Sequence, residues 1–102
     1  MPAYRLSPSA LRDFSDIVTW LHKKVSASVS VATESALWEA CHDIAKLPAI
    51  GHSRGDLTSK PLLFYAVLKY FLIFERTEDG VLVHAIVHSS RDVAAILRRR
   101  KT

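Results

Sequence analysis

The first half of the chain carries apolar side chains at helical spacing. From position 11 to position 25 they recur every three or four residues, which places them on one face of an α-helix. The set comprises Leu11, Phe14, Ile17, Val18, Leu21 and Val25. Ser7 and Pro8 come just before it, and these residue types favour the N-cap and the first helical position. The pattern predicts a first helix from about Pro8 to about Lys24.

A second amphipathic stretch follows a segment whose pattern is ambiguous. In residues 25–31 small apolar residues alternate with serine, as in an exposed strand, although the serines could equally cap a helix. The apolar face behind this segment consists of Leu37, Ala40, Cys41, Ile44 and Leu47. It predicts a second helix from about Ser30 to Leu47, ended by Pro48. Two helices with a short connection form a hairpin whose apolar faces need a second layer.

The second half of the chain has the aliphatic and aromatic composition typical of strands. Runs at 62–68, 69–76 and 80–88 predict three strands, and Asp79-Gly80 indicates a hairpin turn between the last two. A short alternating segment, 4–6, predicts a strand before the first helix. Residues 89–92 resemble a capping box that opens a final short helix. The predicted order is β-α-α-β-β-β-α: an α+β fold, with the helical hairpin packed on a small antiparallel sheet, in a single domain over residues 1–102.

The formal charge of +4 is concentrated at one end of the sequence. Residues 1–50 hold five basic and five acidic side chains, whereas residues 51–102 hold nine and five. Four of those nine are the terminal cations Arg98, Arg99, Arg100 and Lys101. Nucleic-acid-binding proteins usually spread basic residues over a face. The distribution therefore indicates a basic end on a neutral body.

Cysteine content and hydropathy indicate the class of protein. A lone cysteine, Cys41, excludes an internal disulfide and suits a reducing cytoplasm. The N-terminal residues contain no hydrophobic signal core, and the longest uncharged apolar run is too short to span a bilayer. The five histidines show no strong metal-ligand spacing. We expect a cytoplasmic protein with no membrane association, no metal and no cofactor.

The segment from Ile50 to Pro61 holds two of the three glycines and has no apolar period. A phosphate-binding P-loop needs G-x-x-x-x-G-K-[ST] between a strand and a helix, whereas here a predicted helix precedes and a strand follows. The sequence therefore argues against a nucleotide site. We expect Gly51, His52, Arg54 and Asp56 to hold this loop in place, with His52 and Arg54 bonding its backbone carbonyls.

Three blocks of residues, in this order, resemble the ParE branch of the RelE/ParE toxin superfamily. They are Gly51, His52, Arg54, Asp56, Leu57 and Thr58; then Tyr70, Ile73 and Arg76; then His88, Arg91 and Asp92. The segment 4–21 is also similar to the start of that family, so the likeness covers nearly the whole chain. The resemblance implies the toxin of a bacterial type II toxin–antitoxin pair, of the kind associated with plasmid stabilisation. It further implies a cognate antitoxin that binds along the hairpin and sheet.

The same resemblance implies a target and leaves alternatives open. ParE-like toxins act on DNA gyrase with its DNA, without a reaction of their own, and this is the interpretation we favour. The first alternative is a RelE-like, ribosome-dependent endoribonuclease that cleaves mRNA. The second is a ParE-like binding partner without toxicity. The sequence names neither the antitoxin nor the oligomeric state.

A ribonuclease needs a base, an acid and cations around the scissile phosphate. The last helix has no tyrosine or histidine, and Ala85 stands where many relatives carry arginine. If the chain were a nuclease, its candidates would be His84 and His88, spaced to share one strand face, with Arg91 nearby. The enzyme question is open at this stage, with binding favoured over catalysis.

Other residues are candidates for partner contacts. Target contacts are expected from the basic residues Arg91, Arg98, Arg99, Arg100 and Lys101, although Arg91 could instead pair with a loop carboxylate such as Asp56. The apolar hairpin faces predict an antitoxin groove lined by Leu11, Phe14, Leu21, Leu37 and Ile44. Trp20 and Trp38 could be core residues or, if both face outward, anchors for a partner.

Overall fold

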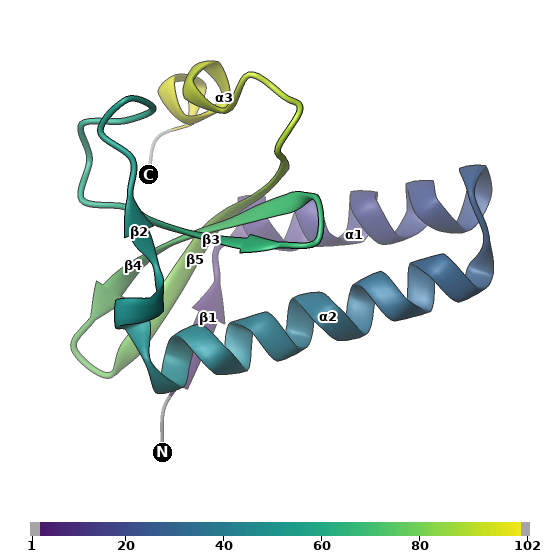
Figure 1. Ribbon diagram of the computed structural model, residues 1–102, viewed down its shortest axis with the longest axis horizontal. Coiled ribbons are helices and arrows are strands. Elements are labelled where there is room, and N and C mark those ends of the chain that lie inside the picture. Colours follow the sequence, from purple (N-terminus) through teal and green to yellow (C-terminus); the bar gives the residue numbers. More distant parts are fainter. Residues whose placement is uncertain (1–2, 101–102) are drawn as a thin grey trace.

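The computed structural model describes residues 3–100, and its elements follow the predicted order (Figure 1). The α+β fold class is confirmed. The elements are β1 Ala3–Leu6, α1 Pro8–Lys24, α2 Ala27–Lys46, the 3-10 helix η1 Pro48–Ile50, β2 His52–Ser53, β3 Leu63–Val67, β4 Tyr70–Thr77, β5 Gly80–His88 and α3 Val93–Arg99.

The strands form one five-stranded sheet in the order β1-β5-β4-β3-β2. β3, β4 and β5 are antiparallel neighbours, as predicted, and β2 adds an antiparallel two-residue strand from within the 50–61 loop. β1 pairs with β5 in the parallel direction, from Ala3 opposite Gly80 to Leu6 opposite Val83. The sheet is therefore mixed, because the chain crosses over the sheet through both hairpin helices before it returns as strands.

Serine caps define where both long helices begin. The Ser7 hydroxyl accepts a hydrogen bond from the Ala10 N–H at 3.1 Å, so α1 starts at Pro8 as predicted. The prediction for α2 was wrong at its start, because Ser26 is the N-cap and accepts from the Val29 N–H at 3.1 Å. Ser30 lies inside the helix, where its hydroxyl donates to the Val18 carbonyl of α1 at 2.9 Å. The ambiguous serine–valine segment is therefore helical from Ala27 onward.

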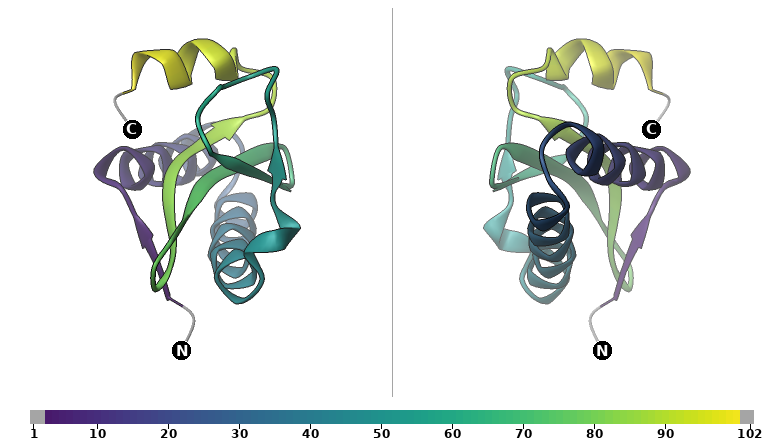
Figure 2. Two further views of the ribbon diagram at one scale, coloured as in Figure 1. Left: turned by 90° about the vertical axis from the view of Figure 1, so that its left-hand side faces the viewer. Right: turned by 90° about the vertical axis from the view of Figure 1, so that its right-hand side faces the viewer.

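The sheet separates two hydrophobic clusters. The side views show helices on both sides of the sheet (Figure 2). The hairpin of α1 and α2 covers one face, and α3 with the loop before β3 covers the other. The hairpin-side cluster includes Phe14, Leu37, Cys41, Ile44, Leu72, Phe74, Val81, Val83 and Ile86. The α3-side cluster includes Leu62, Phe64, Ile73, Ala85, Val87, Val93 and Leu97.

A β-bulge at His84 changes which side chains of β5 face each layer. Ile73 of β4 lies opposite Ala85, but the next residue, Phe74, lies opposite Val83, so His84 is the extra residue. Val83 belongs to the hairpin-side cluster, whereas Ala85 belongs to the α3-side cluster and Ile86 again to the hairpin side. A bulge shifts the alternation by one residue. The prediction that His84 and His88 share one strand face is therefore wrong.

The last helix begins later than a capping box at Ser89 would place it. Asp92 is the N-cap, and its carboxylate accepts a hydrogen bond from the Ala95 N–H at 3.0 Å. Ser89 instead donates its backbone N–H to the Lys69 carbonyl in the β3–β4 turn. This bond joins the end of β5 to that turn, and it sets the position from which α3 starts.

Candidate interaction cleft

A cleft of about 380 Å³ lies where α1, the end of β5 and α3 meet. Its lining includes three of the predicted basic target-contact residues and two of the predicted nuclease residues, His88 and Arg91. The polar lining residues are Asp13, Asp16, Tyr70, His88, Arg91, Arg99 and Arg100. Ile17, Ile86, Val87 and Ile96 form its apolar part. The cleft is the place where the fold brings the charged end of the chain against the first helix.

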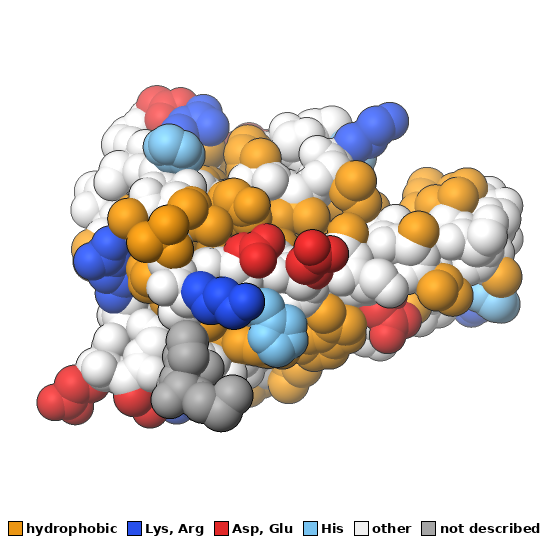
Figure 3. Space-filling view, turned by 60° about the horizontal axis from the view of Figure 1, so that its bottom comes forward, with side chains coloured by type: hydrophobic (Ala, Val, Ile, Leu, Met, Phe, Trp, Pro, Cys, Tyr) orange, Lys and Arg blue, Asp and Glu red, His pale blue; other side chains and the backbone are white. Residues whose placement is uncertain are grey.

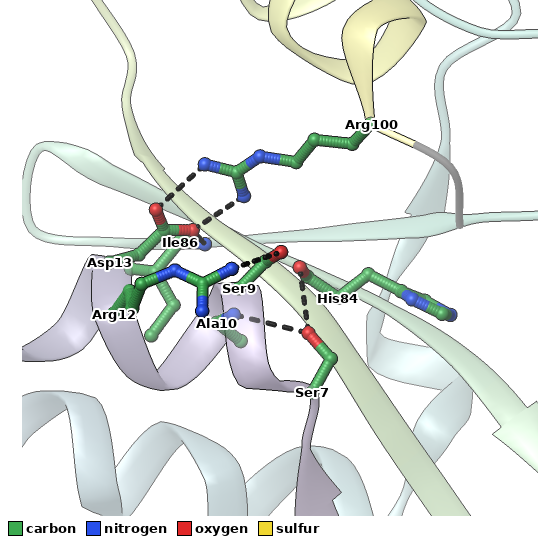
Figure 4. Close-up of polar contacts among 8 residues, drawn as sticks. All are labelled: Ser7, Ser9, Ala10, Arg12, Asp13, His84, Ile86 and Arg100. Atoms are coloured by element: carbon green, nitrogen blue, oxygen red, sulfur yellow. Dashed lines mark hydrogen bonds and ion pairs between the residues drawn. The ribbon is translucent and has the colours of Figure 1, made fainter.

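Asp13 is the structural centre of this cleft (Figure 4). Its carboxylate accepts two hydrogen bonds from the Arg100 guanidinium, at 2.7 and 2.8 Å, and a third from the Ile86 backbone N–H at 3.0 Å. Both side chains are largely withdrawn from solvent, at 14% exposed for Asp13 and 25% for Arg100. The hydrogen bonds from Arg100 to Asp13 raise the pKa of the guanidinium, which keeps it charged. One carboxylate thus joins α1, β5 and the end of α3.

This arrangement corrects the expectation for the basic end. Arg100 is not a free target-contact residue, because a bidentate ion pair occupies it. Lys101 lies outside the described residues. Arg98 faces away from the cleft and lines a separate hollow beside the 55–60 loop. Asp13 was not among the residues singled out from the sequence. Its position, three residues after Ala10 and four before Ile17 on the apolar face of α1, is nevertheless a signal for a buried partner.

Arg91 and Arg99 remain as the available cations of the cleft. Both are exposed, and within residues 3–100 neither side chain forms an ion pair or a hydrogen bond. The predicted alternative, in which Arg91 pairs with Asp56, is wrong because Asp56 pairs with Arg54. Asp16 is also exposed and is the cleft's carboxylate that Arg100 does not neutralise.

His88 and Tyr70 supply further hydrogen-bonding groups to the cleft. The His88 Nδ1 accepts a hydrogen bond from the Ser90 N–H at 3.0 Å and lies 2.7 Å from the Ser90 hydroxyl. A ring nitrogen that accepts a hydrogen bond carries no proton, so the ring proton lies on Nε2. The Tyr70 ring meets the His88 ring edge-on, 5.3 Å between centroids. Burial raises the pKa of Tyr70, so its hydroxyl stays protonated and can donate.

His84 lies on the other face of the sheet, with the α3-side cluster. Its Nε2 is 2.7 Å from the Glu75 carboxylate of β4, and its side chain is only 9% exposed. The bulge that contains His84 thus separates it from His88 and Arg91. The predicted nuclease set of His84, His88 and Arg91 is not brought together in the fold.

The four predicted loop residues hold the 50–61 segment by different means. Arg54 forms a bidentate pair with Asp56, at 2.9 and 2.8 Å, and its guanidinium lies 5.8 Å from the centre of the Phe71 ring. The hydrogen bond from Arg54 lowers the pKa of Asp56. Arg54 therefore bonds a carboxylate, where a backbone carbonyl was expected. The His52 side chain is exposed, and its backbone contacts the sheet through strand pairing opposite Phe64.

Gly51 is set by close packing at the start of this loop. A Cβ at this position would lie 2.6 Å from Cζ of Phe74, which is inside van der Waals contact. Gly51 thus permits the loop to approach the sheet at Phe74.

Comparison with known proteins decides the family. A family model described as "ParE toxin of type II toxin-antitoxin system, parDE" matches residues 4–93, which is most of the chain. This chain belongs to the ParE toxin family. The family resemblance stated from the sequence is confirmed, and the chain is a ParE-type toxin of a type II toxin–antitoxin system.

A solved structure supports the fold of this ParE family member. The structure titled "Chromosomal ParDE TA system from P. aeruginosa" matches with a TM-score of 0.72 at 10% sequence identity. The match covers 86% of this chain and 96% of that one. No curated protein matches the sequence significantly. Within the described residues, none of the helices of this ParE chain has the length and apolar character needed to cross a membrane.

The predicted antitoxin-groove residues of this ParE chain are mostly core residues. Phe14, Leu21, Leu37 and Ile44 are each at most 7% exposed, because they pack between the hairpin and the sheet or between the two helices. Only Leu11 is open to solvent, at 52%. Helical spacing identified the apolar face correctly, but the sheet covers that face.

The exposed apolar surface of the hairpin lies elsewhere. The side chains concerned are Leu11, Trp20, Val25, Val29 and Val31, and the space-filling view shows apolar side chains at the end of the hairpin remote from the sheet (Figure 3). Two shallow hollows of about 320 and 340 Å³ run between α1 and α2. Trp20 is 57% exposed, whereas Trp38 packs on Phe14 with ring centroids 4.6 Å apart. The two tryptophans therefore do not form a joint outward pair.

Proposed function

We propose that this ParE family member inhibits DNA gyrase by binding the enzyme with its DNA, and that a cognate antitoxin neutralises it in the cytoplasm. The observation that carries the choice of binding over catalysis is the bulge at His84. It directs His84 to Glu75 on the α3 side of the sheet, away from His88 and Arg91. His84 therefore does not join His88 and Arg91 at one phosphate, which leaves the histidine-based nuclease set incomplete.

The proposed target surface is the cleft between α1, β5 and α3. Arg91 and Arg99 present two cations there without internal partners in residues 3–100, and such side chains suit an acidic or phosphate-bearing target. Arg98 extends the basic surface toward the 55–60 loop. Binding here requires no change in the Asp13–Arg100 pair.

The proposed antitoxin surface is the exposed apolar part of the hairpin. A segment with an amphipathic helix can place apolar side chains in the hollows between α1 and α2, next to Leu11, Val18 and Val31. This assignment replaces the buried residues of the groove expected from the sequence. It leaves the cleft, which Asp13, Asp16 and Ile17 line on another face of α1, as a separate surface.

The test compares two targets with the purified full-length chain. We expect the chain to trap gyrase–DNA cleavage complexes on supercoiled plasmid and to arrest growth with induction of the DNA-damage response. The same chain, added to translating ribosomes, should leave their mRNA uncleaved. Cleavage of ribosome-bound mRNA with unaffected gyrase would instead establish the RelE-like ribonuclease.

The same experiment addresses the third possibility and the antitoxin. Absence of growth arrest at high expression, with the folded protein present, would identify a ParE-like partner without toxicity. Co-expression of the product of the neighbouring reading frame should restore growth if that product is the antitoxin.

A further inference from the structure

The cleft between α1, β5 and α3 contains more hydrogen-bond donors than the fold itself uses. Arg91 and Arg99 are exposed and form no side-chain bonds within residues 3–100. The Nε2–H of His88 and the hydroxyl of Tyr70 are further donors on residues that line the cleft. Four donor groups with two positive charges suit a ligand with several acceptor oxygens and negative charge.

The negative charge in the lining is largely cancelled. Asp13 accepts three hydrogen bonds, two of them from Arg100, so its charge is neutralised within the fold. Asp16 is the remaining carboxylate of the lining, and it is exposed. Counting Arg91 and Arg99 against Asp16 leaves the cleft with a net positive charge.

We propose that this cleft binds a phosphate group of the DNA backbone. The inference rests on the proposed function, because it gives the toxin a direct contact with the DNA that gyrase holds. The two guanidinium groups would pair with phosphate oxygens, while His88 and Tyr70 donate to the same group. Ile17 and Ile96 provide apolar surface beside it for the adjoining sugar. Backbone contacts position a protein without reading sequence, so binding is independent of DNA sequence.

Charge along the chain favours nucleic acid over an acidic peptide. The described part of the basic end, residues 91–100, holds Arg91, Arg98, Arg99 and Arg100 against the single carboxylate of Asp92, which caps α3. Arg98 lines a separate hollow beside the 55–60 loop, so the basic end presents cations on two surfaces of α3. A polyanion with regularly spaced charges uses both positions.

The experiment measures binding of the full-length chain to a fluorescein-labelled DNA duplex over a series of salt concentrations, without gyrase. Each phosphate contact contributes about 0.9 to the slope of log affinity against log salt. The cleft holds one phosphate, so the double variant Arg91→Ala/Arg99→Ala should lower that slope by about 0.9, an approximately eightfold weaker affinity at 0.1 M salt relative to 1 M. Arg91→Ala and Arg99→Ala alone should each lower the slope by part of that amount. Arg76→Ala is the matched control, because Arg76 is an exposed arginine on β4 that borders a different hollow.

A further variant is expected to have the opposite effect on DNA affinity. Asp16→Asn removes the unneutralised carboxylate from the lining and should tighten DNA binding. The proposal would be overturned if Arg76→Ala changed the salt dependence of DNA affinity as much as the two cleft variants do. It would also be overturned if a poly-aspartate peptide bound more tightly than DNA at the same arginines. Gyrase inhibition that persists without DNA binding would overturn this inference and leave the proposed function intact. DNA binding at the cleft without gyrase inhibition would overturn the proposed function and leave this inference intact.

Discussion

Asp13 shows how one side chain can join three elements. Its carboxylate bonds Arg100 of the C-terminal end and the backbone of β5, while its own helix belongs to the other layer. A charge at 14% exposure is tolerated because hydrogen bonds and an opposite charge replace the water it has lost. The pair also holds the cleft's cationic end against α1. Its contribution is structural, and it leaves Arg91 and Arg99 available.

Asp13→Asn should therefore destabilise the protein by about 2 kcal/mol, because the amide keeps the acceptor for Ile86 but leaves the Arg100 charge without its partner. The measurement is the free energy of unfolding from urea titration. Asp16→Asn, three residues on and exposed, is the control and should change stability by less than about 0.5 kcal/mol. In a double-mutant cycle with Arg100→Met, additive effects would contradict a direct interaction.

At the scale of elements, the parallel pairing of β1 with β5 depends on a glycine, which has no side chain, at position 80. Gly80 begins β5 and lies opposite Ala3, and a Cβ built on Gly80 would be 1.8 Å from the Ala3 carbonyl oxygen. Backbone cannot yield to such a contact as a flexible side chain can. Asp79-Gly80 was interpreted as a hairpin signal, and the turn is where it was predicted. The reason for glycine at position 80 is nevertheless the approach of β1, since none of the described glycines has a positive φ.

Gly80→Ala should displace β1 from the sheet edge and cost about 2 kcal/mol or more of stability. Hydrogen exchange measures this locally, and the amides of residues 3–6 should lose protection while those of β3 and β4 keep it. Gly55→Ala is the control, because a Cβ there meets nothing within 4 Å, and its effect should stay within about 0.5 kcal/mol. Unchanged protection in β1 would show that the strand adjusts without leaving β5.

At the scale of the whole molecule, the hairpin-side cluster buries Cys41. The residue lies on the inner face of α2, is fully buried, and packs in the cluster that includes Leu37, Ile44 and the strands beneath. Burial raises the pKa of its thiol to about 11. The thiolate is the reactive form, so the folded protein protects Cys41 from reaction in two ways. Reagents cannot reach the buried side chain, and the thiol stays protonated.

Alkylation of Cys41 by iodoacetamide at pH 8 should therefore occur only through unfolding. The folded thiol is about 0.1% ionised at that pH, whereas an unfolded thiol of pKa about 8.5 is about a quarter ionised. The folded state favours the protonated thiol, so its contribution to stability is complete below about pH 8.5 and declines as pH rises toward 11. Labelling followed by mass spectrometry, with urea-unfolded protein as control, measures the rate. Rapid labelling without denaturant would contradict a closed core.

Local sequence signals determined the elements of this fold. Ser7 and Pro8 fixed the start of α1, Pro48 followed the end of α2, and Asp79-Gly80 marked the β4–β5 turn. Such signals act within a few residues, so they can be read without knowing what packs where. The family could also be recognised from short blocks, because those blocks keep their order along the chain. The start of α2 was missed because its serines satisfy either a helix cap or a strand pattern.

Only the tertiary structure decided the composition of the cleft. Asp13 and Arg100 are 87 residues apart, and no local rule pairs them. The bulge at His84 depends on how β4 and β5 fit between two layers, and a shift of one residue sends every later side chain to the other face. Burial of Phe14 and Ile44 likewise depends on the sheet that covers them. The sequence determined which side chains were available, and packing determined which of them meet.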